Sequence, residues 1–415
     1  MDRTYRKDLV PELDGLRAFA VLLVLWVHLP AGALGERVQS ISTAVLPGNV
    51  GVDLFFVLSG FLITRILLVD REAGVPLRNF LLRRFLRIFP IYYLAIGVML
   101  PSLSAKEAVA CATYTSNFAF LVKDAISPLE HTWSLAVEEH FYLLWPPVVA
   151  FLTPRASRRV LFGVVLPLGL LSGGAVLLFA DWKNNGAFWL EFMTRSSTVR
   201  CFSLGLGAAF AFHESLLRGR RGLALGVVCG AAALSWATSL GGLETLGLDQ
   251  PIARFYSDRG QPWLPAFQGF YVYSVPLGSL AAVIAAVAFT GTRAPHAIVL
   301  RAGPLRAIGR VSYGIYLYHF PIFVSGAFAP GGGAQPGHVA AAVALCLLVA
   351  AASYVLLERP ILEVAKRFRA AEGATWSTPF SRSGWIALLV FVPILAWILN
   401  GDARTLVHWV LALFG

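Results

Sequence analysis

Two basic side chains, Arg17 and His28, occur in an apolar stretch near the start of the sequence, LDGLRAFAVLLVLWVH, which runs from Leu13 to His28. The guanidinium of Arg17 can bind an anion, and the imidazole of His28 can accept a proton or an acyl group near neutral pH. In an α-helix, eleven residues bring His28 to within ~20° of the azimuth of Arg17 and ~16 Å further along the axis. The spacing predicts one polar stripe, and Asp14 lies one turn before Arg17, where it can pair with it.

Carboxylates that could orient this imidazole occur in two other apolar stretches. Asp53 lies near the start of GVDLFFVLSGFLIT, and Glu138 lies in HTWSLAVEEHFYLLWPP. A carboxylate beside a histidine fixes its tautomer, so either acid is a candidate partner of His28. Asp53 could instead cap the start of a helix, and Glu139, next to Glu138, is expected to be structural. The catalytic candidates are His28, Glu138 and Asp53.

A candidate phosphate clamp lies in RNFLLRRFLRIFPIYY, where Arg84 and Arg87 share one helix face. The alternative is the ordinary basic charge of a cytoplasmic helix end. The small pair Ser59–Gly60, in the middle of its apolar stretch, lets another helix or a thin ligand approach the backbone. The candidates for binding a charged ligand are Arg17, Arg84, Arg87, Ser59 and Gly60.

Other polar residues inside apolar stretches could line a substrate channel. In SYGIYLYHFPIF, Ser312, Tyr316 and His319 fall on one helical stripe, although an aromatic-rich stripe is also typical of a packed core. The channel candidates are Tyr142, Tyr316, His319 and Arg200. His131 is expected at the membrane interface, and spacing names no partner for Arg200 or Glu358. The four cysteines are far apart and without ligand spacing, so no metal is expected.

The segments that must position these residues are those of a membrane protein. Hydrophobic residues make up 57% of the 415, and charged residues only 14%, whereas soluble domains carry about 25%. Apolar segments of roughly 20 residues recur along the sequence. The fold class predicted is an all-α polytopic membrane protein with about 10–11 transmembrane helices in one bundle. The segments lie near 13–30, 49–69, 86–103, 133–153, 159–180, 196–213, 222–241, 266–290, 308–328, 338–357 and 384–400.

The basic residues predict the topology. Segment 107–122 is more polar than the others, and if it does not cross, most of the 34 basic residues fall on the side of the N-terminus. Basic loops are cytoplasmic, so we expect a cytoplasmic N-terminus and an extracytoplasmic or re-entrant segment at 104–132. Residues 1–400 then form a single transmembrane domain, and 401–415 a short interfacial helix. The net charge of +11 therefore needs no nucleic-acid partner.

Five of these motifs, taken together and in order, resemble the acyltransferase-3 family of integral-membrane acyl-CoA-dependent O-acyltransferases. They are LDGLRAFAVLLVLWVH, GVDLFFVLSGFLIT, RRFLRIFPIYY, HTWSLAVEEHFYLLWP and SYGIYLYHFPI. The family pattern of a basic residue, ten residues and a histidine matches Arg17 and His28. Its paired arginines match Arg84 and Arg87, and its acid after Trp-Ser-Leu matches Glu138. His140 is a departure, because the family often has Gln there.

The resemblance implies an activity and a location. Members are similar in moving an acyl group, usually acetyl, from cytoplasmic acyl-CoA to a hydroxyl of an envelope or exported glycan, or of another acceptor, at the outer side. The resemblance thus implies acetyl-CoA as co-substrate, a carbohydrate partner and a bacterial inner (plasma) membrane, with acceptor choice left to short outer loops. His28 could act as general base or carry the acyl group itself. The alternative class is a multi-span transporter or flippase, although the sequence shows no inverted repeat.

Overall fold

The computed structural model describes residues 10–29, 50–121, 127–264, 271–324, 336–369, 391, 392 and 395. Throughout these residues the regular structure is helical. Two compact units are present, each built from three stretches of chain. Unit 1 comprises Met1–Val24, Pro47–Ile66 and Val137–Arg310, and unit 2 comprises Leu25–Leu46, Leu67–Ala136 and Val311–Gly415. The predicted interfacial helix at 401–415 and most of the segment 384–400 lie outside the described residues.

The α-helices are α2 (Glu12–His28), α4 (Val50–Glu72), α5 (Leu77–Met99), α6 (Ala105–Ala112), α7 (Ser116–Ala119), α8 (Trp133–Phe151), α9 (Pro154–Val160), α10 (Leu166–Phe179), α11 (Trp182–Arg195), α12 (Ser197–Gly219), α13 (Arg221–Ala237), α14 (Leu240–Thr245), α15 (Asp249–Ser257), α17 (Tyr271–Ala288), α18 (Pro295–Leu300), α19 (Gly303–Arg310), α20 (Ser312–Val324), α21 (Pro336–Ser353) and α22 (Arg359–Lys366). Shorter 3₁₀ or π turns are η1 (Leu100–Ser102), η2 (Glu130–Thr132), η3 (Leu161–Val165), η5 (Tyr354–Glu358) and η6 (Arg367–Arg369).

Five helical stretches of the described residues are long and apolar enough to cross a membrane. They are Val50–Glu72, Leu77–Ser102, Pro154–Phe179, Tyr271–Ala288 and Gly337–Lys366. The fold class expected from the sequence, an all-α polytopic membrane protein, is confirmed. The weaker segment 107–122 contains most of α6 and all of α7, helices of 8 and 4 residues, each too short to cross a bilayer by itself.

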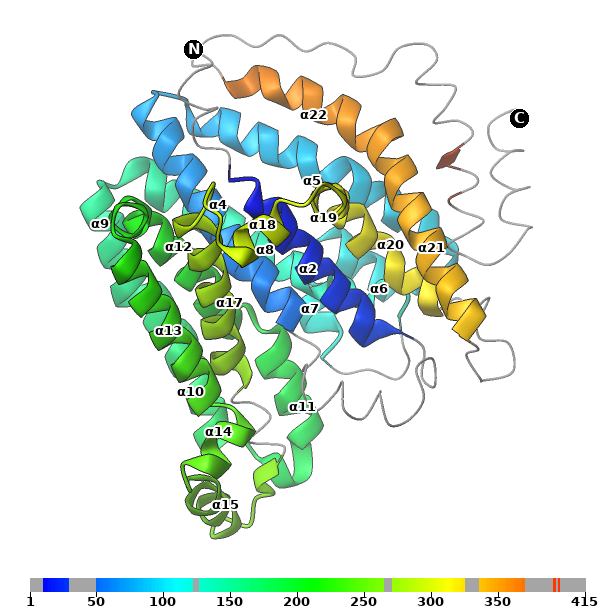
Figure 1. Cartoon of the computed structure of the whole chain (residues 1–415). Coiled ribbons are helices and arrows are strands. Elements are labelled where there is room, and N and C mark those ends of the chain that lie inside the picture. Colours follow the sequence, from blue (N-terminus) through cyan, green and yellow to red (C-terminus); the bar gives the residue numbers. More distant parts are fainter. Residues whose placement is uncertain are drawn as a thin grey trace. The chain divides into compact units, whose positions relative to one another are not determined.

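In unit 1, helices α10, α12, α13 and α17 pack against one another, and α13 lies beside α17 (Figure 1). The core also takes in α4, where the ring of Phe61 stacks on that of Phe210 from α12 at 4.9 Å between centroids. The two helices touch at backbone level. A Cβ added to Gly60 would lie 1.9 Å from the carbonyl oxygen of Leu204, so only glycine permits this crossing.

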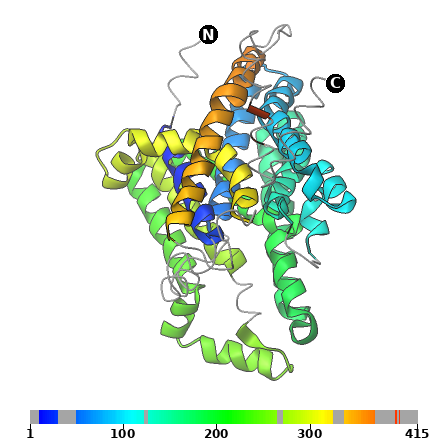
Figure 2. The ribbon, with the colours of Figure 1, turned by 90° about the vertical axis from the view of Figure 1, so that its right-hand side faces the viewer.

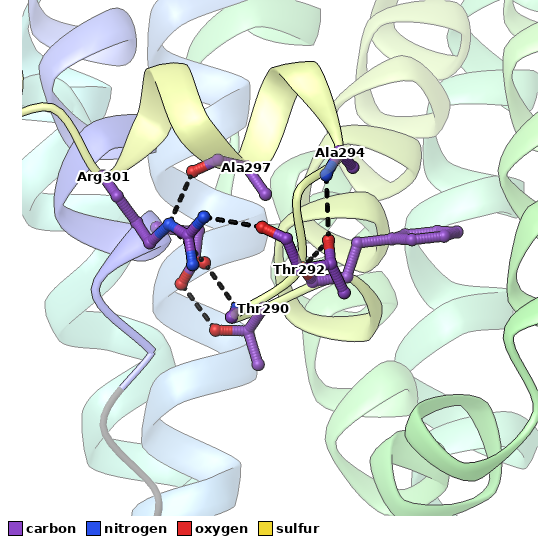
Figure 3. Close-up of polar contacts among 8 residues, drawn as sticks. Thr290, Thr292, Ala294, Ala297 and Arg301 are labelled. Carbon is purple, nitrogen blue, oxygen red and sulfur yellow. Dashed lines mark hydrogen bonds and ion pairs between the residues drawn. The ribbon is translucent and has the colours of Figure 1, made fainter.

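The first turn of α2 is anchored by the buried carboxylate of Glu12, which has no exposed surface. Its oxygens accept hydrogen bonds from the hydroxyl of Thr290 at 2.5 Å and the backbone amide of Gly291 at 3.0 Å. The guanidinium of Arg301 lies 3.6 Å from the same carboxylate. It also donates to the carbonyl of Thr292 (Figure 3). Charge and hydrogen bonds together satisfy a buried acid that would otherwise be costly.

In unit 2, α20 lies beside α21, while α22 and η6 pack on α5 (Figure 2). Arg83 of α5 links this helix to two other segments of unit 2. Its guanidinium donates to the carboxylate of Asp70, near the end of α4, and to the backbone carbonyl of Phe368 in η6, the latter at 2.6 Å. Arg83 therefore has a structural task.

Candidate active site

Unit 2 brings three histidines together that are far apart in the sequence. The ring of His28, at the end of α2, lies 5.0 Å from that of His319 in α20, measured between centroids. The ring of His131, in η2, lies 5.1 Å from His319 on another side. Phe320 packs edge-on against His28 at 5.2 Å. The motif imidazole is thus one member of a cluster, which spacing within a single apolar stretch could not reveal.

Hydrogen bonds link two of these rings. The Nδ1 atom of His319 lies 2.6 Å from the carbonyl oxygen of Tyr316, and its Nε2 atom lies 3.3 Å from Nδ1 of His28. His319 is fully buried, while His28 is half-buried. A half-buried imidazole next to a buried one is placed to meet a substrate on one side while it is held on the other.

His131 is buried inside the protein, with 3% of its surface exposed, and its expected position at the membrane interface stays a prediction. Its Nε2–H donates to the carbonyl of Leu317 at 3.2 Å. Burial, assisted by the nearby His28, lowers the pKa of His131 to about 3, so this ring is neutral at physiological pH. The Tyr316 hydroxyl donates to the carbonyl of His131 at 2.7 Å and contacts the hydroxyl of Ser134 at 2.5 Å. Tyr316 thereby holds the turn that carries His131.

The paired arginines of unit 2, Arg84 and Arg87, lie in the first half of α5. Arg84 is half-buried in α5, and Arg87, one turn later, is exposed. The buried Glu358 of η5, whose partner the sequence left open, interacts electrostatically with Arg87. Guanidinium groups are the side chains that best match a phosphate, so this pair is the candidate phosphate site of the unit.

Two sets of contacts show that α5 and α20 run in the same direction. The hydroxyl of Tyr313 donates to the carbonyl of Ile88 at 3.1 Å. One turn further along α5, the hydroxyl of Tyr92 donates to the carbonyl of Cys111 at 2.9 Å. The Cys111 thiol in turn lies 3.6 Å from the hydroxyl of Thr132, the residue after His131.

His131 donates to the carbonyl of Leu317 in α20, so Leu317 lies near the level of Tyr92, just as Tyr313 lies near the level of Ile88. Residues therefore follow one another in the same direction along α5 and α20. Arg84 and Arg87 precede Ile88, and His319 follows Leu317. Counting 1.5 Å per residue, the two arginines and the His28–His319 pair are separated by roughly 10–15 Å along the helices.

In unit 1, Asp53 and Arg200 form a fully buried ion pair, each with 1% of its surface exposed. Nη1 of Arg200 donates to both carboxylate oxygens of Asp53 at 3.0 Å, and Ser203 donates to one of them at 2.7 Å. Arg200 also donates from Nε to the carbonyl of Thr194 at 2.6 Å. The structure supplies the partner of Arg200 that the sequence could not name. The pair ties α4 to α12.

Ser59 and Glu138, expected in different roles, share a hydrogen bond in unit 1. The Ser59 hydroxyl donates to Oε1 of Glu138 at 2.7 Å. At the neighbouring Gly60, the space beside the backbone is filled by Leu204 of α12. Of the two alternatives for this small pair, the close approach of another helix is the one that the structure shows.

Two more expectations concern unit 1. Arg17 pairs with Asp14 at 3.2 Å, as the i,i+3 spacing predicted. His140, the departure from the family pattern, has its Nδ1 atom 2.7 Å from the hydroxyl of Ser197 at the start of α12. Tyr142, on the same helix, is buried. The channel and ligand-binding roles suggested for Arg17, Tyr142, Tyr316 and Arg200, and the catalytic roles of Asp53 and Glu138, stay predictions.

The fold and the site define a class of protein. It is a helical membrane protein in which one unit holds a half-buried imidazole, His28, and a pair of arginines, Arg84 and Arg87. A family model for an acyltransferase domain matches residues 10–358, which is most of the chain. The chain belongs to the acyltransferase-3 family. The family expected from the sequence is thereby confirmed.

Similar curated proteins are bacterial. Peptidoglycan O-acetyltransferase OatA of Listeria monocytogenes is 32% identical over 347 residues, covering 78% of this chain and 51% of that protein. O-acetyltransferase OatA of Staphylococcus aureus is 30% identical over 427 residues, covering 97% of this chain and 65% of that protein. The putative peptidoglycan O-acetyltransferase YrhL of Bacillus subtilis is 30% identical over 382 residues. The chain thus spans about half to two thirds of the length of these relatives. No solved structure matches it.

Proposed function

We propose that the protein transfers an acetyl group from cytoplasmic acetyl-CoA to a hydroxyl of a cell-wall glycan at the outer side of the membrane. Family membership and the names of the relatives support acetyl transfer to such a glycan. One observation supports acetyl-CoA as the donor. In unit 2, the arginines Arg84 and Arg87 and the half-buried imidazole of His28 are separated along the parallel helices α5 and α20.

The donor fits this arrangement by charge and by length. The phosphates of acetyl-CoA bind Arg84 and Arg87, which present two guanidinium groups from one helix face. The pantetheine arm joins the pyrophosphate to sulfur through about 12 bonds and so spans roughly 15 Å when extended. That length matches the roughly 10–15 Å between the arginines and the histidines. A thioester anchored at these arginines therefore reaches His28.

His28 supplies the reacting base. In direct transfer, its neutral ring takes the proton of the acceptor hydroxyl while that oxygen bonds to the acetyl carbon. The carbon–sulfur bond then breaks, and the imidazolium returns the proton to the departing thiolate. In the two-step route, the ring nitrogen attacks the acetyl carbon and the carbon–sulfur bond breaks, which releases the thiolate. The acceptor hydroxyl then attacks that carbon, the carbon–nitrogen bond breaks, and the hydroxyl proton passes to the thiolate. Both routes need a neutral imidazole and yield the acetyl ester and free CoA.

The test is acetyl transfer by the purified chain in lipid nanodiscs, with radiolabelled acetyl-CoA and a soluble peptidoglycan oligosaccharide. We expect His28→Ala to lower the rate by about 10²–10⁴-fold. The variant should still bind the donor, so acetyl-CoA should raise its melting temperature as it does that of the unchanged protein. His213→Ala is the matched control, because the ring of His213 in α12 hydrogen-bonds to the carbonyl of Ala209 in the same helix. Near-normal transfer by His28→Ala overturns the proposal.

A further inference from the structure

The hydrogen bond between His319 and the backbone settles which nitrogen of that ring carries a proton. A carbonyl oxygen only accepts hydrogen bonds, so the Nδ1 atom of His319, 2.6 Å from the carbonyl of Tyr316, must be the donor. The ring is fully buried, which disfavours its charged form. A neutral imidazole with its hydrogen on Nδ1 has its lone pair on Nε2.

That lone pair determines the tautomer of the next ring. Nε2 of His319 lies 3.3 Å from Nδ1 of His28, and since Nε2 accepts, Nδ1 of His28 must donate. The lone pair of His28 is then on Nε2. We propose that His319 is a positioning residue that holds His28 in this tautomer, with Nε2 as the nitrogen that meets the substrate. The inference rests on the role of His28 in the proposed function.

The surroundings of His319 keep its ring from turning. His131 contacts it edge-on at 5.1 Å and Phe323 at 6.0 Å between centroids. The carbonyl that accepts from it belongs to Tyr316, whose own hydroxyl is bound to the turn at His131. The opposite tautomer of His319 would set a nitrogen lone pair against the carbonyl oxygen, and two acceptors at that distance repel each other.

This arrangement serves both chemical routes without bringing His319 to the reacting atoms. As general base, His28 takes the hydroxyl proton on Nε2, and its Nδ1–H keeps donating to His319 while the ring is charged. As acyl carrier, it attacks the acetyl carbon through the same Nε2. His319 plays the part that a carboxylate plays in hydrolase triads, with a backbone carbonyl completing the chain.

The first experiment compares His319→Leu with His319→Gln in the transfer assay. The leucine variant has no acceptor for Nδ1–H of His28, and we expect kcat to fall at least about 10²-fold with little change in KM for acetyl-CoA. The glutamine amide oxygen can replace Nε2 as acceptor, so this variant should recover most of the lost kcat. Tyr318→Phe is the control on the same helix, since it removes only the contact between the Tyr318 hydroxyl and Ser353. Equal loss in the leucine and glutamine variants, or a change confined to KM, overturns the proposal.

The second experiment needs no activity. In protein labelled with ¹⁵N-histidine, solid-state NMR distinguishes a protonated ring nitrogen from a bare one, and His28→Ala identifies the signals of His28. We expect a protonated Nδ1 and a bare Nε2 in the unchanged protein, and loss of this preference in His319→Leu. A protonated Nε2 on His28 overturns the inference whatever the enzyme does. If the tautomer is as stated and His28→Ala still transfers acetyl groups, it is the proposed function that fails.

Discussion

Ser59 of α4 donates a hydrogen bond to the carboxylate of Glu138 of α8 across 2.7 Å. The sequence suggested a ligand-lining role for Ser59 and a catalytic role for Glu138, and nothing in their spacing joined them, since they are 79 residues apart. The hydrogen bond couples one residue of α4 to one residue of α8. The two side chains are therefore expected to act as a unit.

The first prediction is a double-mutant cycle on this pair. Hydrogen bonds to charged groups contribute about 1.5–3 kcal/mol, so Ser59→Ala and Glu138→Leu should each reduce transfer or stability. The double variant should lose little more than Glu138→Leu does, because leucine has no acceptor and the shared bond is already broken. Rates and unfolding temperatures of the four proteins provide the measurement, and strictly additive losses would contradict the coupling.

The second prediction concerns the donor. Arg84→Gln and Arg87→Gln should each raise KM for acetyl-CoA by about 10–100-fold with a smaller effect on kcat, because each removes a charge-assisted hydrogen bond worth about 1.5–3 kcal/mol. Titration of acetyl-CoA in the transfer assay measures both constants. Arg159→Gln, an exposed arginine of α9, is the matched control. An equal rise in KM for this control would show that only overall charge matters.

The third prediction concerns the buried ion pair. Arg200→Met leaves the carboxylate of Asp53 buried and uncompensated, so we expect a loss of about 3–5 kcal/mol in the free energy of unfolding. Arg200→Met combined with Asp53→Asn should lose less than Arg200→Met alone. Lys366→Met is the contrast, since its pair with Glu363 is exposed and worth below about 1 kcal/mol. Denaturation in detergent measures all three. A loss no larger than that of Lys366→Met would argue against a stabilising pair.

The fourth prediction is a pH dependence. The folded-state pKa of His131 is about 3, below the unfolded value of 6.5, so the unfolded chain takes up a proton that the folded one does not. Stability should therefore be unaffected above pH 6.5 and fall as the pH drops from 6.5 towards 3, by about 1.4 kcal/mol per pH unit from this group. His131→Gln keeps a donor for the carbonyl of Leu317 and should flatten the curve of melting temperature against pH. Parallel curves for the two proteins would contradict this origin of acid sensitivity.

The fifth prediction uses two glycines with opposite surroundings. Gly60→Ala places a Cβ against the backbone of Leu204, so it should cost about 1–3 kcal/mol of stability. Gly97→Ala in α5 meets nothing within 4 Å and should gain about 0.5–1 kcal/mol from helix propensity. Unfolding of the two variants under the same conditions gives the comparison, and the same sign for both would rule out the crossing as the cause.

Local pattern predicted much of this molecule. Apolar runs of the length of a bilayer gave α4 and α5, and an i,i+3 spacing gave the pair of Arg17 with Asp14. The sequence did not predict which side chains contact each other when they are far apart along the chain. His28 and His319 are 291 residues apart, and Arg200 and Asp53 are 147 apart. Helical periodicity tells which face a residue occupies but not which face of another helix it meets, so the partner of each buried charge required the fold.

The distance along the chain between Asp53 and Arg200 has a consequence for biosynthesis. Ribosomes add about 5–20 residues per second, so the acid of α4 is made roughly 7–30 s before its counterion in α12. During that interval a lone carboxylate must wait in the translocation channel, stay at the headgroups or take up a proton. Once α12 has been made, Arg200 compensates that charge, so a helix synthesised early is stabilised by one synthesised much later.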